Sequence, residues 1–375
     1  MNNYSTYRLN EICKISTGKW DANHAVENGR YRFYTCSNKF TMCDTASFNG
    51  ECVIVPGNGD LGLLFYYNGE FDAYQRTYVL SDIKIYPKYL YYHMKYKWRN
   101  STEKLNYGST IKYVRITNFT SYEIGVPDIE IQRAIVARIE ELFAELDKAV
   151  EHLCTAQQQL KTYRQAVLNH WLTNGSKRWK MVTIGDIVEK VEYGSSAKSQ
   201  KTGRVPVLRM GNIQNGRFDW SDLVYSDDDE EIKKYLLKKD DVLFNRTNSP
   251  ELVGKTAIYK GEHPAIFAGY LIRLHRKEDL INADFLNYYL NSDIAKNYGN
   301  TVKSDGVNQS NINGQKLKTY PLFLPSLSEQ QRIVEEIETR LSQAEAVEVH
   351  IAEALQKTES LRQSILKKAF SGELV

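Results

Sequence analysis

The sequence predicts an α+β protein in which two mixed α/β domains are separated by two long antiparallel helices that form an intramolecular coiled coil. Three observations predict this fold. A segment of about fifty residues occurs twice at a constant offset of 198 residues, each copy has the apolar spacing of one long helix, and short strands and helices precede each copy. A chain of 375 residues is long enough for two domains plus such helices.

The repeat begins at Val126 and again at Leu324. Pro127 matches Pro325, and Gln132 matches Gln330, without any gap at this offset. An ungapped repeat of this length indicates one unit written twice, with a pseudo-twofold relation between the copies. The chain is accordingly divided into a first domain (1–127), a central long helix (128–173), a second domain (174–325) and a C-terminal long helix (326–375).

Each repeated segment has the three-four alternation of apolar residues that is typical of a coiled coil. Two such stripes bury each other most simply by pairing within the chain, and a pseudo-twofold makes the two helices antiparallel. The residues expected to pair the helices are Val136, Ile139, Phe143, Leu146, Val150, Leu153, Leu160, Val167, Val334, Ile337, Leu341, Ile351, Leu355 and Ile365.

The preceding segments are weakly similar as well. Short apolar runs at 52–56 and 241–245 predict strands, while 89–97 and 284–296 predict short helices. The segment 9–12, followed by Gly18, resembles the segment 184–187, followed by Gly194. Both domains are therefore expected to be mixed α/β.

Charge is divided unevenly along the chain. Residues 1–127 carry 15 Lys and Arg against 11 Asp and Glu, and residues 174–325 carry 23 against 19, so each domain has a net charge of +4. The helical segments 128–173 and 326–375 carry −2 and −3. This division favours nucleic-acid binding by the domains and protein contacts along the helices.

The loops of both domains are rich in amide and guanidinium groups, which form directional hydrogen bonds with base edges. For any one of these loops taken alone, a solvated turn is the favoured interpretation. The candidate DNA-binding residues are Asn58, Gln75, Arg76, Lys104, Asn106, Lys112, Arg209, Asn212, Asn245, Arg246, Lys303, Asn308, Gln309 and Asn311.

Motifs for catalysis are incomplete. Gly254-Lys255-Thr256 resembles the end of a phosphate-binding loop, but Ser249 stands where that loop needs its first glycine. The nearest approach to the tripeptide of adenine methyltransferases, at 248–250, lacks the second proline. The acidic run 227–231 is contiguous and therefore typical of a solvated loop. We expect a non-catalytic chain that holds no metal and no cofactor.

The chain is expected to be cytoplasmic. It has no apolar run of 18 or more residues, and its first residues lack the basic flank and apolar core of a secretory signal. Five cysteines at irregular spacing predict free, buried thiols and not a disulfide framework.

With its repeat, its helix starts at Pro127 and Pro325 and its Gly-Glu-Leu-Val ending, the whole chain resembles the specificity subunits of type I restriction-modification systems. The resemblance implies two target recognition domains, each binding half of a split, asymmetric site in double-stranded DNA. It also implies that the helices set the spacing and dock two methyltransferase subunits, which restriction and translocase subunits join. S-adenosylmethionine, ATP and Mg²⁺ then belong to those partners. The alternative is a coiled-coil adaptor without sequence-specific DNA binding.

Overall fold

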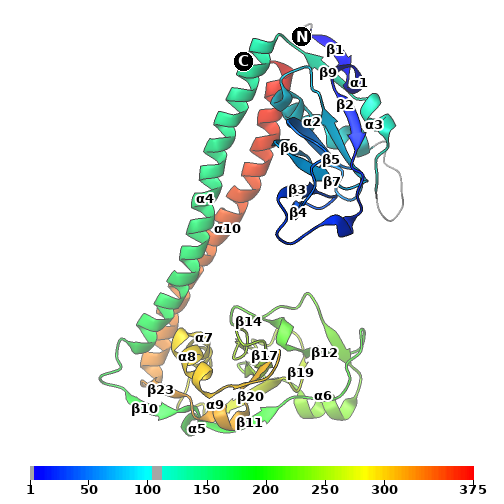
Figure 1. Ribbon diagram of the computed structural model, residues 1–375. Coiled ribbons are helices and arrows are strands. Elements are labelled where there is room, and N and C mark those ends of the chain that lie inside the picture. The colour runs from blue at the N-terminus through cyan, green and yellow to red at the C-terminus, as the bar shows by residue number, and fades with distance from the viewer. Residues whose placement is uncertain (1–3, 104–111) are drawn as a thin grey trace. The chain divides into compact units, whose positions relative to one another are not determined.

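The computed structural model describes residues 4–103 and 112–375, and the chain divides into two compact units. Unit 1 comprises residues 1–154 and 352–375, and unit 2 comprises residues 155–351. Both boundaries fall inside the long helices, so each unit consists of one α/β domain and a part of each helix (Figure 1). The division by sequence, in contrast, treats the helices as segments of their own.

The domain of unit 1 contains two sheets and a separate strand pair (Figure 1). The antiparallel four-stranded sheet has the spatial order β2 (Lys14–Thr17), β8 (Thr77–Ser81), β5 (Glu51–Pro56) and β6 (Phe65–Asn68). The three-stranded sheet has the order β4 (Thr41–Cys43), β3 (Tyr31–Tyr34) and β7 (Phe71–Ala73), with β3 and β7 parallel. β1 (Ser5–Arg8) pairs with β9 (Glu123–Val126), and the helices are α1 (Leu9–Ile12), a 3-10 turn (Ala22–His24), α2 (Pro87–Glu103) and α3 (Ile116–Thr120).

The domain of unit 2 is built on the same plan. Its four-stranded sheet has the order β11 (Val188–Tyr193), β20 (Leu271–Arg276), β16 (Val242–Asn245) and β18 (Thr256–Ile258). Its three-stranded sheet has the order β15 (Val224–Ser226), β12 (Val205–Leu208) and β19 (Ile266–Phe267), with β12 and β19 parallel. β10 (Lys180–Thr183) pairs with β23 (Pro321–Leu324), and the helices are α5 (Ile184–Ile187), a 3-10 turn (Met210–Asn212), α6 (Asp229–Tyr235), α7 (Ala283–Asn291), α8 (Asp293–Val302) and α9 (Gly314–Lys318).

In chain order, the seven strands of the two sheets correspond one to one between the units. β2, β3, β4, β5, β6, β7 and β8 correspond to β11, β12, β15, β16, β18, β19 and β20. Unit 2 also contains the hairpin of β13 (Ile213–Gln214) and β14 (Arg217–Phe218), and a three-stranded ribbon in the order β17 (Thr247–Asn248), β22 (Ser310–Asn311), β21 (Ser304–Asp305). The duplication that the long helices indicate therefore extends through both domains.

Gly18 and Gly194, which follow the first strand of the four-stranded sheet in each unit, lie at close backbone approaches. A Cβ on Gly18 would lie 1.8 Å from the carbonyl oxygen of Ala73, and one on Gly194 would lie 2.3 Å from that of Phe267. Gly18 thus lets the chain at the end of β2 lie close to the backbone of β7, and Gly194 lets the chain at the end of β11 lie close to that of β19. Only glycine fits at such a close approach.

The long helices are α4 (Ile129–Thr173) and α10 (Leu327–Ser371), close to the expected bounds. They run antiparallel within each unit. In unit 2, Arg164 lies 2.7 Å from Glu348, and Arg340 lies over the ring of Trp171. The residue later in α4 thus contacts the residue earlier in α10, as in an antiparallel pair. In unit 1, Arg362 pairs with Asp147. None of the fourteen residues expected to pair the helices is exposed, and six of them are fully buried: Val136, Ile139, Val167, Val334, Ile337 and Ile351.

Each unit has a core in which a helix of the domain lies between the four-stranded sheet and the long helices. In unit 1, α2 contributes Leu90 and Met94 to a cluster that also contains Ile139 and Leu366. In unit 2, α7 contributes Phe285 and Leu286 to a cluster with Ile337. The long helices are therefore part of the core of each unit.

Two expectations need correction. The single helix expected at 284–296 is two helices, because Ser292 has extended backbone angles, ends α7 and caps α8 by accepting a hydrogen bond from Ala295 N. The five cysteines are free, but only Cys13, Cys43 and Cys52 are buried as expected, whereas Cys36 is half-buried and Cys154 is exposed. None of the helices in the described part of the chain has the length and apolarity that a membrane span requires.

Candidate nucleic-acid interface

Site 1 is a cavity of about 440 Å³ in unit 1, where the chain leaves β5, enters β8 and approaches α3. Backbone hydrogen bonds join these three segments. Gly57 N donates to Arg76 O at 2.9 Å, and Val114 N donates to Gly57 O at 2.9 Å. The lining residues are Thr17, Gly57, Asn58, Gln75, Arg76, Tyr78, Tyr113, Val114 and Arg115.

The polar side chains of site 1 are of the kinds that bind DNA. Gln75 and Arg76 are exposed, and Asn58 is half-buried beside them. The guanidinium of Arg115 donates to the hydroxyl of Tyr113 at 3.2 Å. Burial raises the pKa of Tyr78, so its phenol stays neutral and able to donate a hydrogen bond. Lys112 is exposed. Its carbonyl accepts a hydrogen bond from Gly59 N at 3.0 Å, which places Lys112 next to this cavity.

Site 2 is an open cavity of about 780 Å³ at the corresponding place in unit 2. Arg246 N donates to Tyr270 O at 3.0 Å, and Ile312 N donates to Arg246 O at 2.8 Å. These are the same two backbone bonds as in site 1, with Arg246 in the place of Gly57. The lining residues are Arg246, Thr247, Tyr270, Ser304, Asp305, Gly306, Val307, Asn308, Gln309, Ser310 and Asn311.

The correspondence between the sites covers the backbone and not the side chains. Tyr270 takes the place of Arg76, because its carbonyl accepts the corresponding backbone hydrogen bond. Asn311 takes the place of Tyr113, because Asn311 pairs with Thr247 in unit 2 as Tyr113 pairs with Asn58 in unit 1. The two sites therefore offer different hydrogen-bonding groups from one framework. Chemically, such a pair suits the recognition of two different sequences.

Arg246 is the best-placed cation of site 2. Its guanidinium carbon lies 4.9 Å from the centre of the Tyr193 ring, which orients the group through a cation–π interaction. The Nε atom of Arg246 is buried without a hydrogen-bond partner in the described part of the chain. A buried donor without a partner is costly in a protein alone, and an acceptor on a bound ligand would remove that cost.

Seven of the fourteen predicted DNA-binding residues line these two sites, and five others in the described part of the chain do not. Asn245 is fully buried beneath Arg246, and its side-chain oxygen accepts from Thr247 N. Lys303 lies beside site 2 and donates to Pro250 O at 3.3 Å. Lys104 and Asn106 lie outside the described residues.

Arg209 and Asn212 do not line site 2. Arg209 lies 3.1 Å from Asp222, and the amide of Asn212 donates to Asp219 O and Asp222 O. Both side chains therefore serve the loop that contains them. Tyr270 and Arg115 line the sites but were not among the residues predicted from the sequence. Tyr270 could have been found from its position, since it directly precedes the apolar strand 271–276 as Arg76 directly precedes the strand 77–81.

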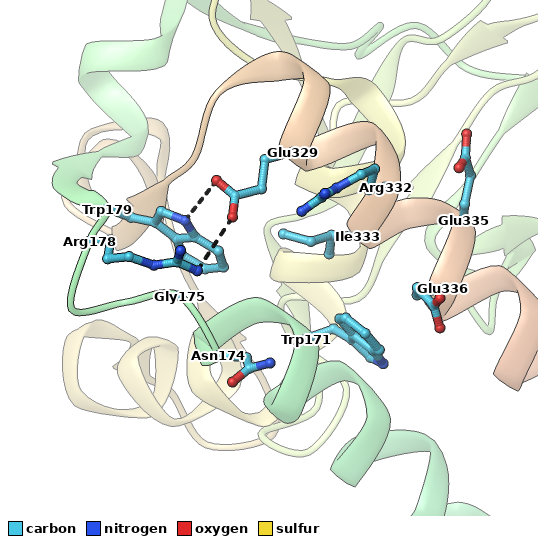
Figure 2. Close-up of a pocket in the computed structure, with 10 residues that line it drawn as sticks. All are labelled: Trp171, Asn174, Gly175, Arg178, Trp179, Glu329, Arg332, Ile333, Glu335 and Glu336. Carbon is cyan, nitrogen blue, oxygen red and sulfur yellow. Dashed lines mark hydrogen bonds and ion pairs between the residues drawn. The ribbon is translucent and has the colours of Figure 1, made fainter.

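A further pocket in unit 2, of about 450 Å³, lies where α4 ends and α10 begins (Figure 2). Figure 2 shows Glu329 pointing to Trp179 and Arg178, with the Trp179 indole donating to the carboxylate at 3.0 Å. Glu335 and Glu336 add two more carboxylates. With three acidic and two basic side chains, this pocket has no excess of positive charge for phosphate, and sites 1 and 2 are better candidates for DNA.

The described residues contain no group of three or more His, Cys, Asp or Glu side chains that could hold a metal ion.

A duplicated α/β domain packed on paired long helices, with a polar site of different side chains in each copy, defines a two-domain recognition scaffold. Residues 1–152 and 176–357 match the model of the type I restriction modification DNA specificity domain, and the chain belongs to this family. It is a specificity subunit, which supplies DNA-sequence recognition to a type I restriction-modification complex and is itself non-catalytic. The expected family, fold class and function are thereby confirmed.

Curated relatives and solved structures agree with this assignment. The chain is 28% identical to the EcoDI specificity subunit of Escherichia coli, over 99% of this chain and 88% of that protein. It is 29% identical to the EcoKI specificity subunit of Escherichia coli K12, over 74% of this chain and 63% of that protein. One solved structure concerns complex assembly and conformational transition of the type I restriction-modification system. Its matching chain has a TM-score of 0.78 and 17% identity, over 100% of this chain and 99% of that chain. The HsdS subunit from Thermoanaerobacter tengcongensis has a TM-score of 0.56, with 19% identity and coverage of 100% and 98%. These two structures support the fold.

Proposed function

We propose that site 1 and site 2 each contact one half of a bipartite, asymmetric site in double-stranded DNA. The observation that supports this proposal is the shared backbone framework with unlike side chains: Gly57 and Arg76 in site 1 correspond to Arg246 and Tyr270 in site 2. Duplication preserves the place of contact, while substitution changes the base edges that can be bound. Two half-sites of different sequence follow from this arrangement.

The charges of the two sites suit this role. Arg76, Lys112 and Arg115 surround site 1, and Arg246 and Lys303 are at site 2. Guanidinium groups form paired hydrogen bonds with guanine, and the amides of Asn58, Gln75 and Gln309 suit adenine. Each site has only two or three of these cations and can therefore neutralise few DNA phosphates. In this proposal, partner subunits supply further contacts with the DNA backbone.

The partners proposed for the chain are two methyltransferase subunits and the restriction and translocase subunits. The exposed faces of α4 and α10 are their proposed docking surface, since these helices carry net negative charge and keep their apolar stripes for each other. In this proposal S-adenosylmethionine, ATP and Mg²⁺ bind to the partner subunits.

Selection from a random duplex pool tests the proposal. The chain in complex with the methyltransferase subunits of its own system should enrich one motif with two specified blocks and an unspecified spacer. Long-read methylation sequencing of a host that carries the same genes should return the same motif. An adaptor without DNA recognition would enrich no sequence, and a single uninterrupted block would contradict a role for two sites.

A further inference from the structure

The most exposed apolar side chain of unit 2 is at the tip of a hairpin in site 2. Val307 is 100% exposed, whereas the other exposed valines and leucines range from 38% to 59%. Val307 and Asn308 form the two-residue tip between β21 and β22, closed by Gly306 N donating to Gln309 O at 2.7 Å. Tips of this kind usually contain Gly, Asn, Asp or Ser, so valine is not explained by the needs of the turn.

The hairpin that carries Val307 is firmly held at its base. β22 pairs with β21 on one side and with β17 on the other, and the amide of Asn311 donates to the hydroxyl of Thr247 at 2.7 Å. Ser310 is fully buried and donates its hydroxyl to Asp305. Contacts with a ligand at the tip therefore need little further ordering of the hairpin.

The surroundings of Val307 are those of a base-edge contact. Asn308 and Gln309 are exposed amides next to it in the chain, and Arg246 lines the same cavity. Amides of this kind form paired hydrogen bonds with adenine in the major groove, where a two-stranded ribbon fits. The thymine opposite that adenine presents its C5-methyl group in the same groove, and an aliphatic side chain is a suitable contact for it.

A wedge between bases is a less suitable role. Residues that unstack base steps are mostly larger, such as Phe, Leu, Ile or Met, and they act from the minor groove. Valine is short and branched at Cβ, with one preferred side-chain rotamer in most settings. It presents a small, fixed apolar surface, which matches a methyl group better than a base step.

We propose that Val307 is a specificity-determining residue that contacts the C5-methyl group of one thymine in the half-site bound by site 2. The inference rests on the proposed function of site 2 and assigns a base to one residue of it. Gln309, Asn308 or both then bind the adenine paired with that thymine or the adjacent base.

Replacing thymine by uracil tests this contact, because it removes only the C5-methyl group. The duplex selected from the random pool is prepared with uracil at each thymine in turn, and the affinity of the complex is measured for every version. One replacement should weaken binding by the wild-type complex about fourfold, the value for one buried methyl group. The Val307→Ser variant should bind the thymine duplex about fourfold less tightly and should no longer distinguish uracil at that position.

Two further variants keep the test decisive. Val307→Ile retains an aliphatic side chain and should still prefer thymine at that position, while Val26→Ser, which changes a valine that is 45% exposed in unit 1, should leave every preference unchanged. The inference is overturned if no uracil replacement depends on residue 307, or if Val307→Ser weakens all duplexes equally, as a wedge or backbone contact would. Failure of the selection to enrich any sequence would instead overturn the proposed function itself.

Discussion

Gln132 and Gln330 make two corresponding hydrogen bonds in their respective units. The side-chain oxygen of Gln132 accepts from Tyr86 N at 2.9 Å, and its amide donates to Pro127 O at 2.7 Å. The side-chain oxygen of Gln330 accepts from Asn282 N at 2.7 Å, and its amide donates to Pro325 O at 2.9 Å. Each glutamine thus joins the start of a long helix to the start of α2 or α7, which explains why proline and glutamine keep their spacing in both copies of the repeat.

Replacing the fully buried Gln330 by alanine should destabilise unit 2 by about 1–3 kcal/mol, because the N–H of Asn282 and the carbonyls of Pro325 and Leu280 lose this partner. Urea unfolding followed by circular dichroism measures the change. Gln331→Ala is the matched control, since Gln331 is exposed and bonds to Asn282 and Glu335 at the surface; it should change stability by less than about 0.5 kcal/mol. Equal losses in the two variants would argue against this role for Gln330.

The pairing of the long helices gives a second prediction. Ile337 is fully buried in the core of unit 2, so Ile337→Ala should cost about 2–5 kcal/mol through lost burial and a new cavity. Val347 is 47% exposed on the same helix, and Val347→Ala should change stability by less than about 0.5 kcal/mol. Denaturant unfolding compares both variants with the wild type. A small effect at residue 337 would mean that the stripe on α10 is not part of the core.

The helices could be predicted from the sequence, and the geometry of the sites could not. The three-four spacing of apolar residues repeats for many turns, so the bounds of α4 and α10 were expected to within a few residues. Site 2, in contrast, is assembled by backbone hydrogen bonds between residues far apart in the chain, such as those of Arg246 with Tyr270 and Ile312. Loop composition selected Arg246 and Gln309, which line site 2, but it also selected Asn212, whose amide donates hydrogen bonds within its own loop.

Acid should destabilise unit 1 through His93. His93 is on α2, its ring packs against that of Phe370 of α10, and its Nδ1 lies 2.9 Å from the hydroxyl of Tyr122. Burial, and to a smaller degree the charge of Lys97, lowers the pKa of His93 to about 3. An unfolded histidine titrates near 6.5. Between about pH 6.5 and pH 3 the unfolded chain binds a proton that the folded chain excludes, so stability falls as the pH falls through this window and is unaffected above it.

The loss should amount to about 2 kcal/mol between pH 6.5 and pH 5. Urea unfolding at both pH values, followed by tryptophan fluorescence, to which Trp98 in the core of unit 1 contributes, measures it. His93→Gln should reduce this pH dependence, whereas His152→Gln, a change on the exposed surface of α4, should not. The same pH dependence in wild type and His93→Gln would show that another group is responsible.

The separate sites predict separate losses of specificity. Arg76→Ala should relax the bases of one half-site, and Arg246→Ala should relax those of the other, each at a cost of about 1–3 kcal/mol in binding to the selected duplex. Selection from a random pool by each variant complex shows which block of the motif has lost information. Arg99→Ala is the control, because Arg99 pairs with Asp60 at the surface of unit 1, 2.8 Å away, and does not line site 1.

Two outcomes would count against this assignment. If Arg246→Ala weakens both blocks equally, the guanidinium contacts phosphate or supports folding, because a base contact affects only the half-site in which that base lies. If Arg76→Ala and Arg246→Ala relax the same block, the correspondence between sites 1 and 2 would not extend to separate half-sites. Loss of one block in each variant, with the other block unchanged, is the result that two independent sites on one duplicated framework require.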